Sequence, residues 1–200
     1  MGLNPKGVDV RVAIAAWKWG AYLGEDGLHN GIRVCVSSFN RHHINISMTR
    51  AKACGYYINS IIAKSEALRD GYDEAILLDT NGYVSEGSGE NIFVLSKGVL
   101  RTPVLACGPL DGITRDTVLQ LCNHLKIKWE EGFLTRDEMY LADEIFLTGT
   151  AAEITPVREV DNRKVGNGKK GKITDLIQKN FFNIVGGKDP RFKKWLTEVD

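Results

Sequence analysis

The chain has 200 residues, of which 43% are hydrophobic and 26% are charged, and its formal net charge is +1. This is the composition of an ordinary globular protein, long enough to bury one good core. Because the net charge is close to zero, we expect no nucleic-acid partner and no binding to a membrane surface. The first residues show no signal-peptide pattern, and no apolar run is long enough to span a bilayer.

The cysteines lie far apart in apolar sequence, at Cys35, Cys54, Cys107 and Cys122. We therefore predict reduced thiols that pack as small hydrophobic residues in a cytoplasmic protein. Together with the four histidines they show no metal-ligand spacing, so we predict no metal.

Most of the predicted strands lie in the first half of the chain. A buried strand is predicted at residues 10–17 (V-R-V-A-I-A-A-W), followed by a glycine-punctuated aromatic loop. Further strands are predicted at residues 32–38, 74–79, 92–95 and 99–102. The Asn81-Gly82 dipeptide is a strong hairpin-turn signal.

A helix is predicted after Lys52 and ends at Arg69 and Gly71, which are typical of a helix C-terminus. Its apolar residues recur at the spacing of one buried face, at Tyr57, Ile58, Ile61, Ile62 and Leu68. Lys52 lies among small residues (A-K-A-C-G), which would solvate its ammonium poorly, lower its pKa and make it a usable nucleophile. A surface lysine at a helix start is the commoner interpretation, so Lys52 alone decides nothing.

The second half of the chain mixes helices and strands. A helix capped by Thr114 is predicted to bury Val118, Leu121, Cys122 and Leu125, and a short strand follows at residues 127–129. Thr135 and Glu138 have the spacing of a capping box at a short helix. A strand at 144–147, a polar hairpin at 157–165 and an amphipathic helix at 174–185 complete the pattern. Without regular βαβ alternation, this order favours an α+β domain.

Three glycine-rich turns could carry chemistry. Gly112-Ile113-Thr114 offers backbone N–H groups and a hydroxyl at a helix start, which suits a phosphate, and the G-T-A-A turn at 149–152 offers a second such set. Taken singly, an ordinary cap or turn is the commoner interpretation of each. Glu86 could be a surface residue or a buried carboxylate that keeps a pyridine nitrogen protonated. A G-x-G-x-x-G match at residues 166–171 lacks a βαβ context, so it predicts a dinucleotide site only weakly.

Five blocks resemble a known family: S-S-F-N-R, A-K-A-C-G-Y-Y, N-G-Y-V-S-E-G-S-G-E-N-I-F, G-I-T-R-D and Y-L-A-D-E-I-F-L-T-G-T-A-A-E-I-T-P-V. Together they are similar to the class IV aminotransferases, most closely to the bacterial branched-chain group. The resemblance implies pyridoxal 5'-phosphate as the cofactor. It also implies the α+β, pseudo-barrel large domain of the fold type IV pyridoxal-phosphate enzymes.

The resemblance assigns roles residue by residue. Lys52 matches the lysine that binds the cofactor covalently, Tyr57 the tyrosine bonded to its phenolic oxygen, and Glu86 the partner of its pyridine nitrogen. The other matches are Leu110 on the ring face, Gly112, Ile113, Thr114 and Thr150 at the phosphate, Thr150 and Ala151 at the substrate carboxylate, and Trp19 in the side-chain pocket.

The implied activity is a ping-pong transfer of the amino group between Leu, Ile or Val and 2-oxoglutarate, which forms branched 2-oxo acids. A homodimer or higher homo-oligomer is implied as well. The alternatives are D-amino acid aminotransferase, aminodeoxychorismate lyase, an inactive truncated fragment and a nucleotide-binding module.

The resemblance also implies domain boundaries. Residues 1–16 match the end of a smaller N-terminal domain, 17–30 an interdomain loop and 31–200 the large domain. In the family the smaller domain supplies an arginine to the cofactor phosphate. We therefore expect this chain alone to bind the cofactor weakly and not to transaminate.

Overall fold

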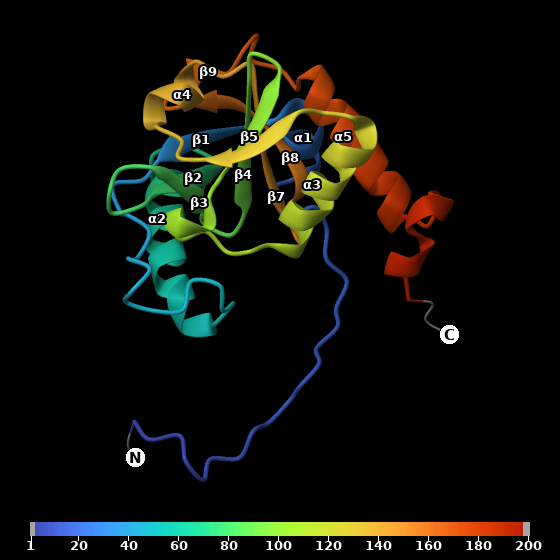
Figure 1. The fold of residues 1–200 in the computed structure, drawn as a ribbon. Coiled ribbons are helices and arrows are strands. Elements are labelled where there is room, and N and C mark those ends of the chain that lie inside the picture. The colour runs from blue at the N-terminus through green and yellow to red at the C-terminus, as the bar shows by residue number, and fades with distance from the viewer. Residues whose placement is uncertain (1–2, 198–200) are drawn as a thin grey trace.

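The computed structural model describes residues 3–197, and a mixed nine-stranded sheet forms the centre of that part of the chain (Figure 1). The main path of the sheet runs β3-β2-β1-β8-β7-β4-β5-β6, and β9 pairs with β8. The strands are β1 (Ile32–Val36), β2 (Glu74–Leu78), β3 (Val84–Gly87), β4 (Asn91–Ser96), β5 (Val99–Pro103), β6 (Trp129–Gly132), β7 (Glu144–Gly149), β8 (Glu153–Val160) and β9 (Arg163–Lys164). Parallel pairs join β1 to β2 and β8 and join β5 to β6, whereas the other pairs are antiparallel. The predicted α+β fold is confirmed.

Helices cover the sheet in two groups. The α-helices are α1 (Glu25–Asn30), α2 (Tyr57–Arg69), α3 (Ile113–Leu125), α4 (Arg136–Tyr140) and α5 (Lys172–Val185), with short 3₁₀ helices η1 (Cys54–Tyr56), η2 (Leu105–Cys107) and η3 (Pro190–Trp195). Helices α3 and α5 pack together beside β7, whereas α2 packs on β2 (Figure 1). Between α3, α5 and the sheet, the rings of Phe93 and Phe146 stack with centroids 5.0 Å apart.

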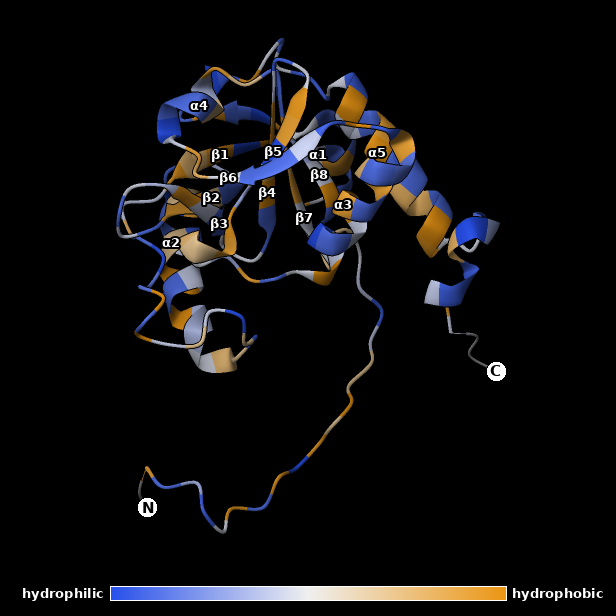
Figure 2. Ribbon diagram, viewed as in Figure 1, coloured by the Kyte–Doolittle hydropathy of each residue, from blue (hydrophilic) through white to orange (hydrophobic). Residues whose placement is uncertain are grey.

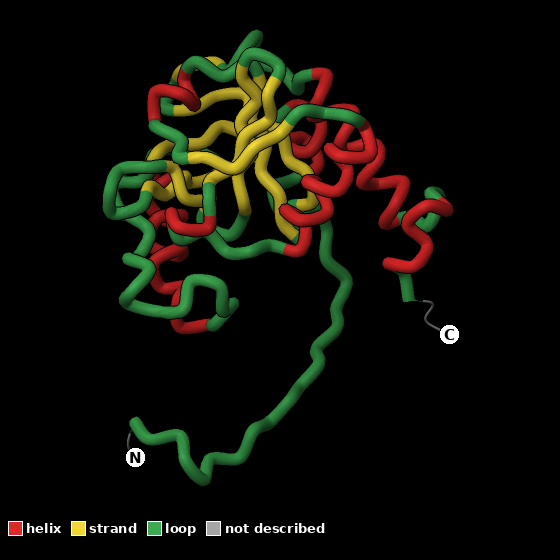
Figure 3. Tube along the Cα trace, in the orientation of Figure 1, coloured by secondary structure: helices red, strands yellow, loops and turns green. Residues whose placement is uncertain are grey.

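The strand predicted at residues 10–17 is wrong. This segment is extended but has no strand partner among the described residues, and it runs away from the body of the protein (Figure 3). Val10 and Ile14 are 92% and 95% exposed, and Figure 2 shows apolar residues along this isolated stretch. The alternation of apolar residues correctly indicates extended backbone, but a strand also needs a neighbouring strand to complete its hydrogen bonds.

Helix α2 lies where it is predicted but buries the opposite face from the one expected. The small residues Ser60, Ala63 and Ala67 face the sheet. The apolar residues expected inside are exposed: Tyr57, Ile58, Ile61, Ile62 and Leu68. Alanine lets the helix approach β2 closely and bury its backbone, so the larger isoleucines point outward.

Other local predictions had mixed outcomes. The capping box of Thr135 and Glu138 at α4 is confirmed, as is the turn at Asn81-Gly82, where Gly82 has φ +89°. The cap predicted at Thr114 is wrong, because Gly112 is the N-cap and α3 begins at Ile113. The strand predicted at 127–129 lies at β6, two residues later, where it pairs with β5. Strand β3 and helix α1 were not predicted.

The cysteines and the glycine-rich loop before α5 also correct the sequence analysis. Cys35, Cys107 and Cys122 are buried thiols, but Cys54 is exposed and does not pack as predicted. The glycine loop follows β9, which is antiparallel to β8, so no βαβ unit exists there. The carboxylate of Glu144 already accepts hydrogen bonds from the first turn of α5, which contradicts a nucleotide phosphate at that helix end. Within residues 3–197, no helix has the length and apolar character needed to cross a membrane.

Candidate active site

The candidate site is centred on Glu86, a carboxylate buried inside strand β3. The side chain is only 8% exposed, and both of its oxygens are bonded. Oε1 lies 2.9 Å from Nε of Arg41, and Oε2 accepts a hydrogen bond from the Leu110 N–H at 2.8 Å. Burial raises the pKa of Glu86, while Arg41, the Leu110 N–H and Lys52 act in the opposite direction. Of the two interpretations of Glu86 that the sequence allowed, the buried carboxylate is therefore the correct one.

A pocket opens beside Glu86, between the segment before α2, strand β3 and the loop before α3. Lys52 and Tyr57 line it, with the Lys52 Nζ 5.5 Å from the centroid of the Tyr57 ring. The other lining residues are Arg41, Ala51, Ala53, Tyr56, Ser60, Ser88, Gly89 and Leu110. Two cations and one carboxylate therefore meet in this pocket, which suits an anionic ligand.

Lys52 itself departs from expectation. The sequence predicted a poorly solvated ammonium at the helix start, but Lys52 is exposed and precedes the 3₁₀ helix η1. Small neighbours leave a lysine open to solvent unless another part of the structure covers it, and no described residue does so here. The position of Lys52 in the same pocket as Glu86 is nevertheless what a lysine-bound ligand would need.

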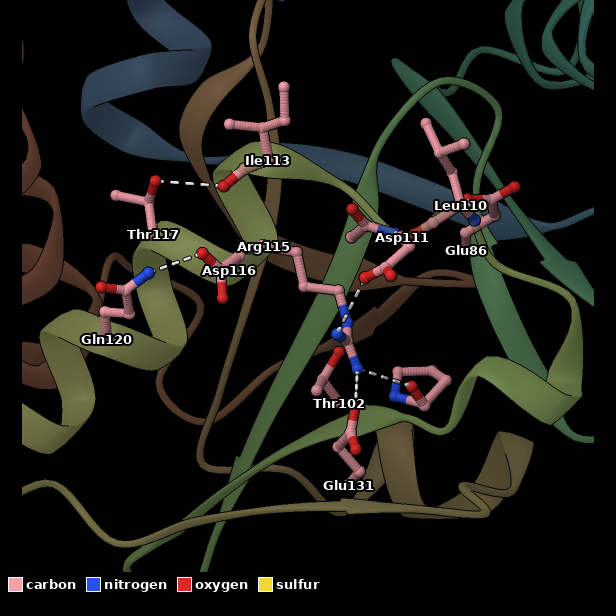
Figure 4. A network of polar contacts seen from close by, with 12 residues as sticks. Glu86, Thr102, Leu110, Asp111, Ile113, Arg115, Asp116, Thr117, Gln120 and Glu131 are labelled. Atoms are coloured by element: carbon pink, nitrogen blue, oxygen red, sulfur yellow. Dashed lines mark hydrogen bonds and ion pairs between the residues drawn. The ribbon is translucent and has the colours of Figure 1, made fainter. Parts of the chain in front are cut away.

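The loop at residues 108–112 is held at Leu110 by one residue of β3 and one of β4 (Figure 4 shows Glu86 and Leu110). The Leu110 N–H bonds to Glu86, and the Leu110 carbonyl oxygen accepts a hydrogen bond from the Asn91 amide at 2.8 Å. The absence of a side chain at Gly112 leaves room for this bond, because a Cβ at this position would lie 2.1 Å from the Asn91 Oδ1. This anchoring fixes the Leu110 side chain at the wall of the pocket.

The first turn of α3 provides unpaired donors. Gly112 makes no side-chain capping bond, and within residues 3–197 the backbone N–H groups of Ile113 and Thr114 donate to no acceptor. The buried Arg115 holds the turn in place by donating to the Pro103 carbonyl and pairing with Glu131 and Asp111 (Figure 4).

Thr114 and Thr150 both line a second hollow, which this helix start and the β7–β8 turn border. Thr150 and Ala151 also border a third hollow, which Trp19 lines from the N-terminal loop. Thr150 borders both hollows, which therefore meet at the end of β7, whereas Gly112 lines neither of them.

Sequence reasoning missed Arg41 in the pocket and Tyr22 beside Trp19. Arg41 lies inside the resembling block S-S-F-N-R, but the resemblance gave this arginine no role. Tyr22 was missed as well, although it contacts Trp19 edge to face with the rings 5.9 Å apart. Burial, together with Glu90 and Glu74, raises the pKa of Tyr22 to about 12. The sequence signal that could have indicated Tyr22 is its position shortly after two tryptophans in the glycine-rich loop.

Comparison with known proteins decides the family. A family model described as Amino-transferase class IV matches residues 2–160. The chain belongs to this family. A curated relative from Pseudomonas aeruginosa, named branched-chain-amino-acid aminotransferase, is 56% identical over 200 residues, covering 100% of this chain and 64% of the relative. The chain therefore spans slightly less than two thirds of that relative's length.

Solved structures of the class IV family agree with the fold. The branched-chain amino acid aminotransferase of Escherichia coli superimposes with a TM-score of 0.91 at 49% identity, covering 93% of this chain and 61% of that one. The corresponding enzyme of Thermobaculum terrenum, in its PLP-form, gives a TM-score of 0.81 at 42% identity, covering 83% and 54%. The predicted fold class and family resemblance are thus confirmed.

Proposed function

We propose that this chain carries the cofactor-binding part of a pyridoxal-phosphate-dependent aminotransferase that acts on branched-chain amino acids and 2-oxoglutarate. The observation that carries the proposal is the buried carboxylate of Glu86 in one pocket with Lys52. The relative named above and its solved counterparts support the substrate class. The predicted domain boundaries, oligomer and cytoplasmic location stay predictions.

The residues present fit the cofactor. A pyridine nitrogen needs a buried acidic partner, and Glu86 is one. A phosphate needs donors at a helix start, which the uncapped first turn of α3 supplies next to Thr114 and Thr150. Leu110 lines the pocket of Lys52 and Glu86, where an apolar side chain can cover a ring face.

The chain's own groups divide the work of transamination. When bound, pyridoxal phosphate supplies an electron sink that stabilises negative charge at the α-carbon of the amino acid. Lys52 holds the cofactor covalently and, once released, its amine takes the α-proton and returns it. Glu86 holds a proton on the pyridine nitrogen. Tyr57 bonds the phenolic oxygen, while Thr150 and Ala151 orient the substrate carboxylate.

Borohydride trapping tests the cofactor site directly. The chain is incubated with excess pyridoxal phosphate, reduced with borohydride and digested, and the modified lysine is identified by mass spectrometry. We expect the label on Lys52. A label spread over the exposed lysines, with no enrichment at Lys52, would contradict the proposed site.

Substrate class is tested in a chimera that joins this chain to the part of the Pseudomonas aeruginosa relative that it does not match. With bound cofactor and no 2-oxoglutarate, L-leucine should release one equivalent of its branched 2-oxo acid per site. Formation of a 2-oxo acid from D-alanine and not from L-leucine would favour the D-amino acid aminotransferase alternative.

A further inference from the structure

Arg41 is a buried arginine that the proposed function has not used. It follows β1, and its backbone N–H donates to the Leu78 carbonyl at 2.7 Å, which ties this loop to the end of β2. Its side chain is 7% exposed and lines the same pocket as Lys52 and Glu86. A buried arginine is costly unless it is paired, so its partner indicates its role.

The partner is Glu86. Nε of Arg41 lies 2.9 Å from Oε1 of Glu86, and the same Nε lies 3.4 Å from the Gly108 carbonyl. Arg41 therefore links strand β3 to the loop that carries Leu110. No other arginine or lysine of the described chain forms an ion pair with Glu86.

The protonation state of Glu86 depends on a balance of opposing effects. Burial favours the neutral acid, and the Glu90 carboxylate on the β3–β4 turn adds repulsion whenever it is ionised. Among the groups that favour the carboxylate, Arg41 has the largest effect, ahead of the Leu110 N–H and Lys52. Lys52 no longer carries a free ammonium when it holds the cofactor covalently. Arg41 is then the remaining cation that faces Glu86.

We propose that Arg41 is a positioning residue that keeps Glu86 ionised and aimed at the pyridine nitrogen of the cofactor. An ionised carboxylate stabilises a protonated pyridine, whereas a neutral acid does not. Without Arg41, the buried Glu86 takes up the proton itself, and the electron sink weakens. This inference rests on the proposed function, because it assumes that the pyridine ring occupies this pocket.

A double-mutant cycle tests the pairing in the cofactor-free chain. Urea unfolding at pH 7 is measured for wild type, Arg41→Met, Glu86→Gln and the double variant. We expect Arg41→Met to lower the folding equilibrium constant at least tenfold when Glu86 is present, and much less when Glu86→Gln is already in place. If Arg41→Met lowers the folding equilibrium constant equally with Glu86 and with Glu86→Gln, the proposed pairing is wrong.

The second readout is the ¹⁵N chemical shift of the pyridine nitrogen in protein loaded with ¹⁵N-labelled pyridoxal phosphate. Wild type and the charge-conserving Arg41→Lys should show a protonated nitrogen, and Arg41→Met a deprotonated one. Arg101→Met removes an arginine that does not line the pocket, and it should leave the shift unchanged. If Arg41→Met does not fold, Arg41→Gln takes its place.

The outcomes separate the two proposals. A protonated nitrogen in Arg41→Met overturns the role of Arg41, while trapping at Lys52 still supports the proposed function. If borohydride reduction does not label Lys52 in the wild-type protein, the proposed function is contradicted. A folded wild type without coupling between Arg41 and Glu86 overturns the present inference whether or not cofactor binds.

Discussion

Glu144 at the start of β7 caps helix α5 through Thr174. One carboxylate oxygen lies 2.8 Å from the backbone nitrogen of Thr174 and 2.7 Å from its Oγ1, and the other accepts the Ile173 N–H at 3.1 Å. We expect Glu144→Ala to destabilise the chain by at least about 2 kcal/mol, because charge-assisted bonds to buried groups are lost. Urea unfolding measures this loss. The control is Asp116→Ala in the exposed first turn of α3, which should cost less than about 1 kcal/mol.

Glu90 makes the stability of the chain pH-dependent. Burial, followed by the nearby Glu74, raises the pKa of Glu90 from 4.5 to about 8. The folded state therefore keeps a proton that the unfolded chain releases above pH 4.5, so the stability from this group is complete below that pH and is lost as pH rises to about 8. The slope is at most about 1.4 kcal/mol per pH unit. Glu90→Gln should flatten it in urea unfolding from pH 5 to 8, whereas Asp9→Asn in the exposed N-terminal segment should leave it unchanged.

Gly112→Ala tests the anchoring of the loop before α3. The added Cβ would lie 2.1 Å from the Asn91 Oδ1, so the Asn91 amide must move and lose its bond to the Leu110 carbonyl. We expect a loss of about 1–3 kcal/mol in urea unfolding. Gly20→Ala has nothing within 4 Å and should change stability by less than about 0.5 kcal/mol. A similar cost for both variants would contradict this account.

Two substitutions on α2 test which of its faces packs on the sheet. Ala63 is fully buried and Ile61 is 60% exposed. Ala63→Leu should overpack the contact with β2 and cost about 1–3 kcal/mol. Ile61→Gln should change the free energy of unfolding by no more than about 0.5 kcal/mol. The reverse ranking in urea unfolding would mean that the isoleucine face is the buried one.

Lys52→Ala should abolish transamination in the chimera described above. One amine serves both as the covalent anchor and as the proton carrier, so we expect a loss of at least about a hundredfold in the release of 2-oxo acid from leucine. Lys128→Ala, at an exposed lysine far along the chain, is the matched control. A Lys52→Ala protein with about a tenth of the wild-type turnover would exclude Lys52 as the catalytic residue.

Features encoded in a few adjacent residues could be predicted from the sequence. Thr135 and Glu138 form their capping box within one helical turn, and Asn81-Gly82 forms its turn with Asp79 bonds to neighbouring N–H groups. Lys52, Glu86 and Leu110 were placed in one pocket only by resemblance, because neither periodicity nor spacing relates residues so far apart in the chain. The structure brings all three to the same pocket.

Features that depend on distant partners could not be predicted. The apolar alternation at Val10 and Ile14 gives no information on whether a neighbouring strand exists. The isoleucines of α2 have the spacing of a buried face, but the distance to β2 selects Ala63 and Ala67 instead. The Arg41–Glu86 pair joins a loop to a strand through the fold, and a single arginine in a loop carries no sign of such a partner.

The isolated N-terminal segment divides the chain into two regimes of amide hydrogen exchange. Among the described residues, the backbone N–H groups of residues 9–20 donate no hydrogen bond, so they should exchange with solvent at nearly the rate of an unfolded peptide. Strand β7 is bonded on both edges, to β4 and β8, and its amides should exchange only when the whole sheet opens. Mass spectrometry after brief deuteration would therefore find the boundary between fast and slow amides close to the start of α1.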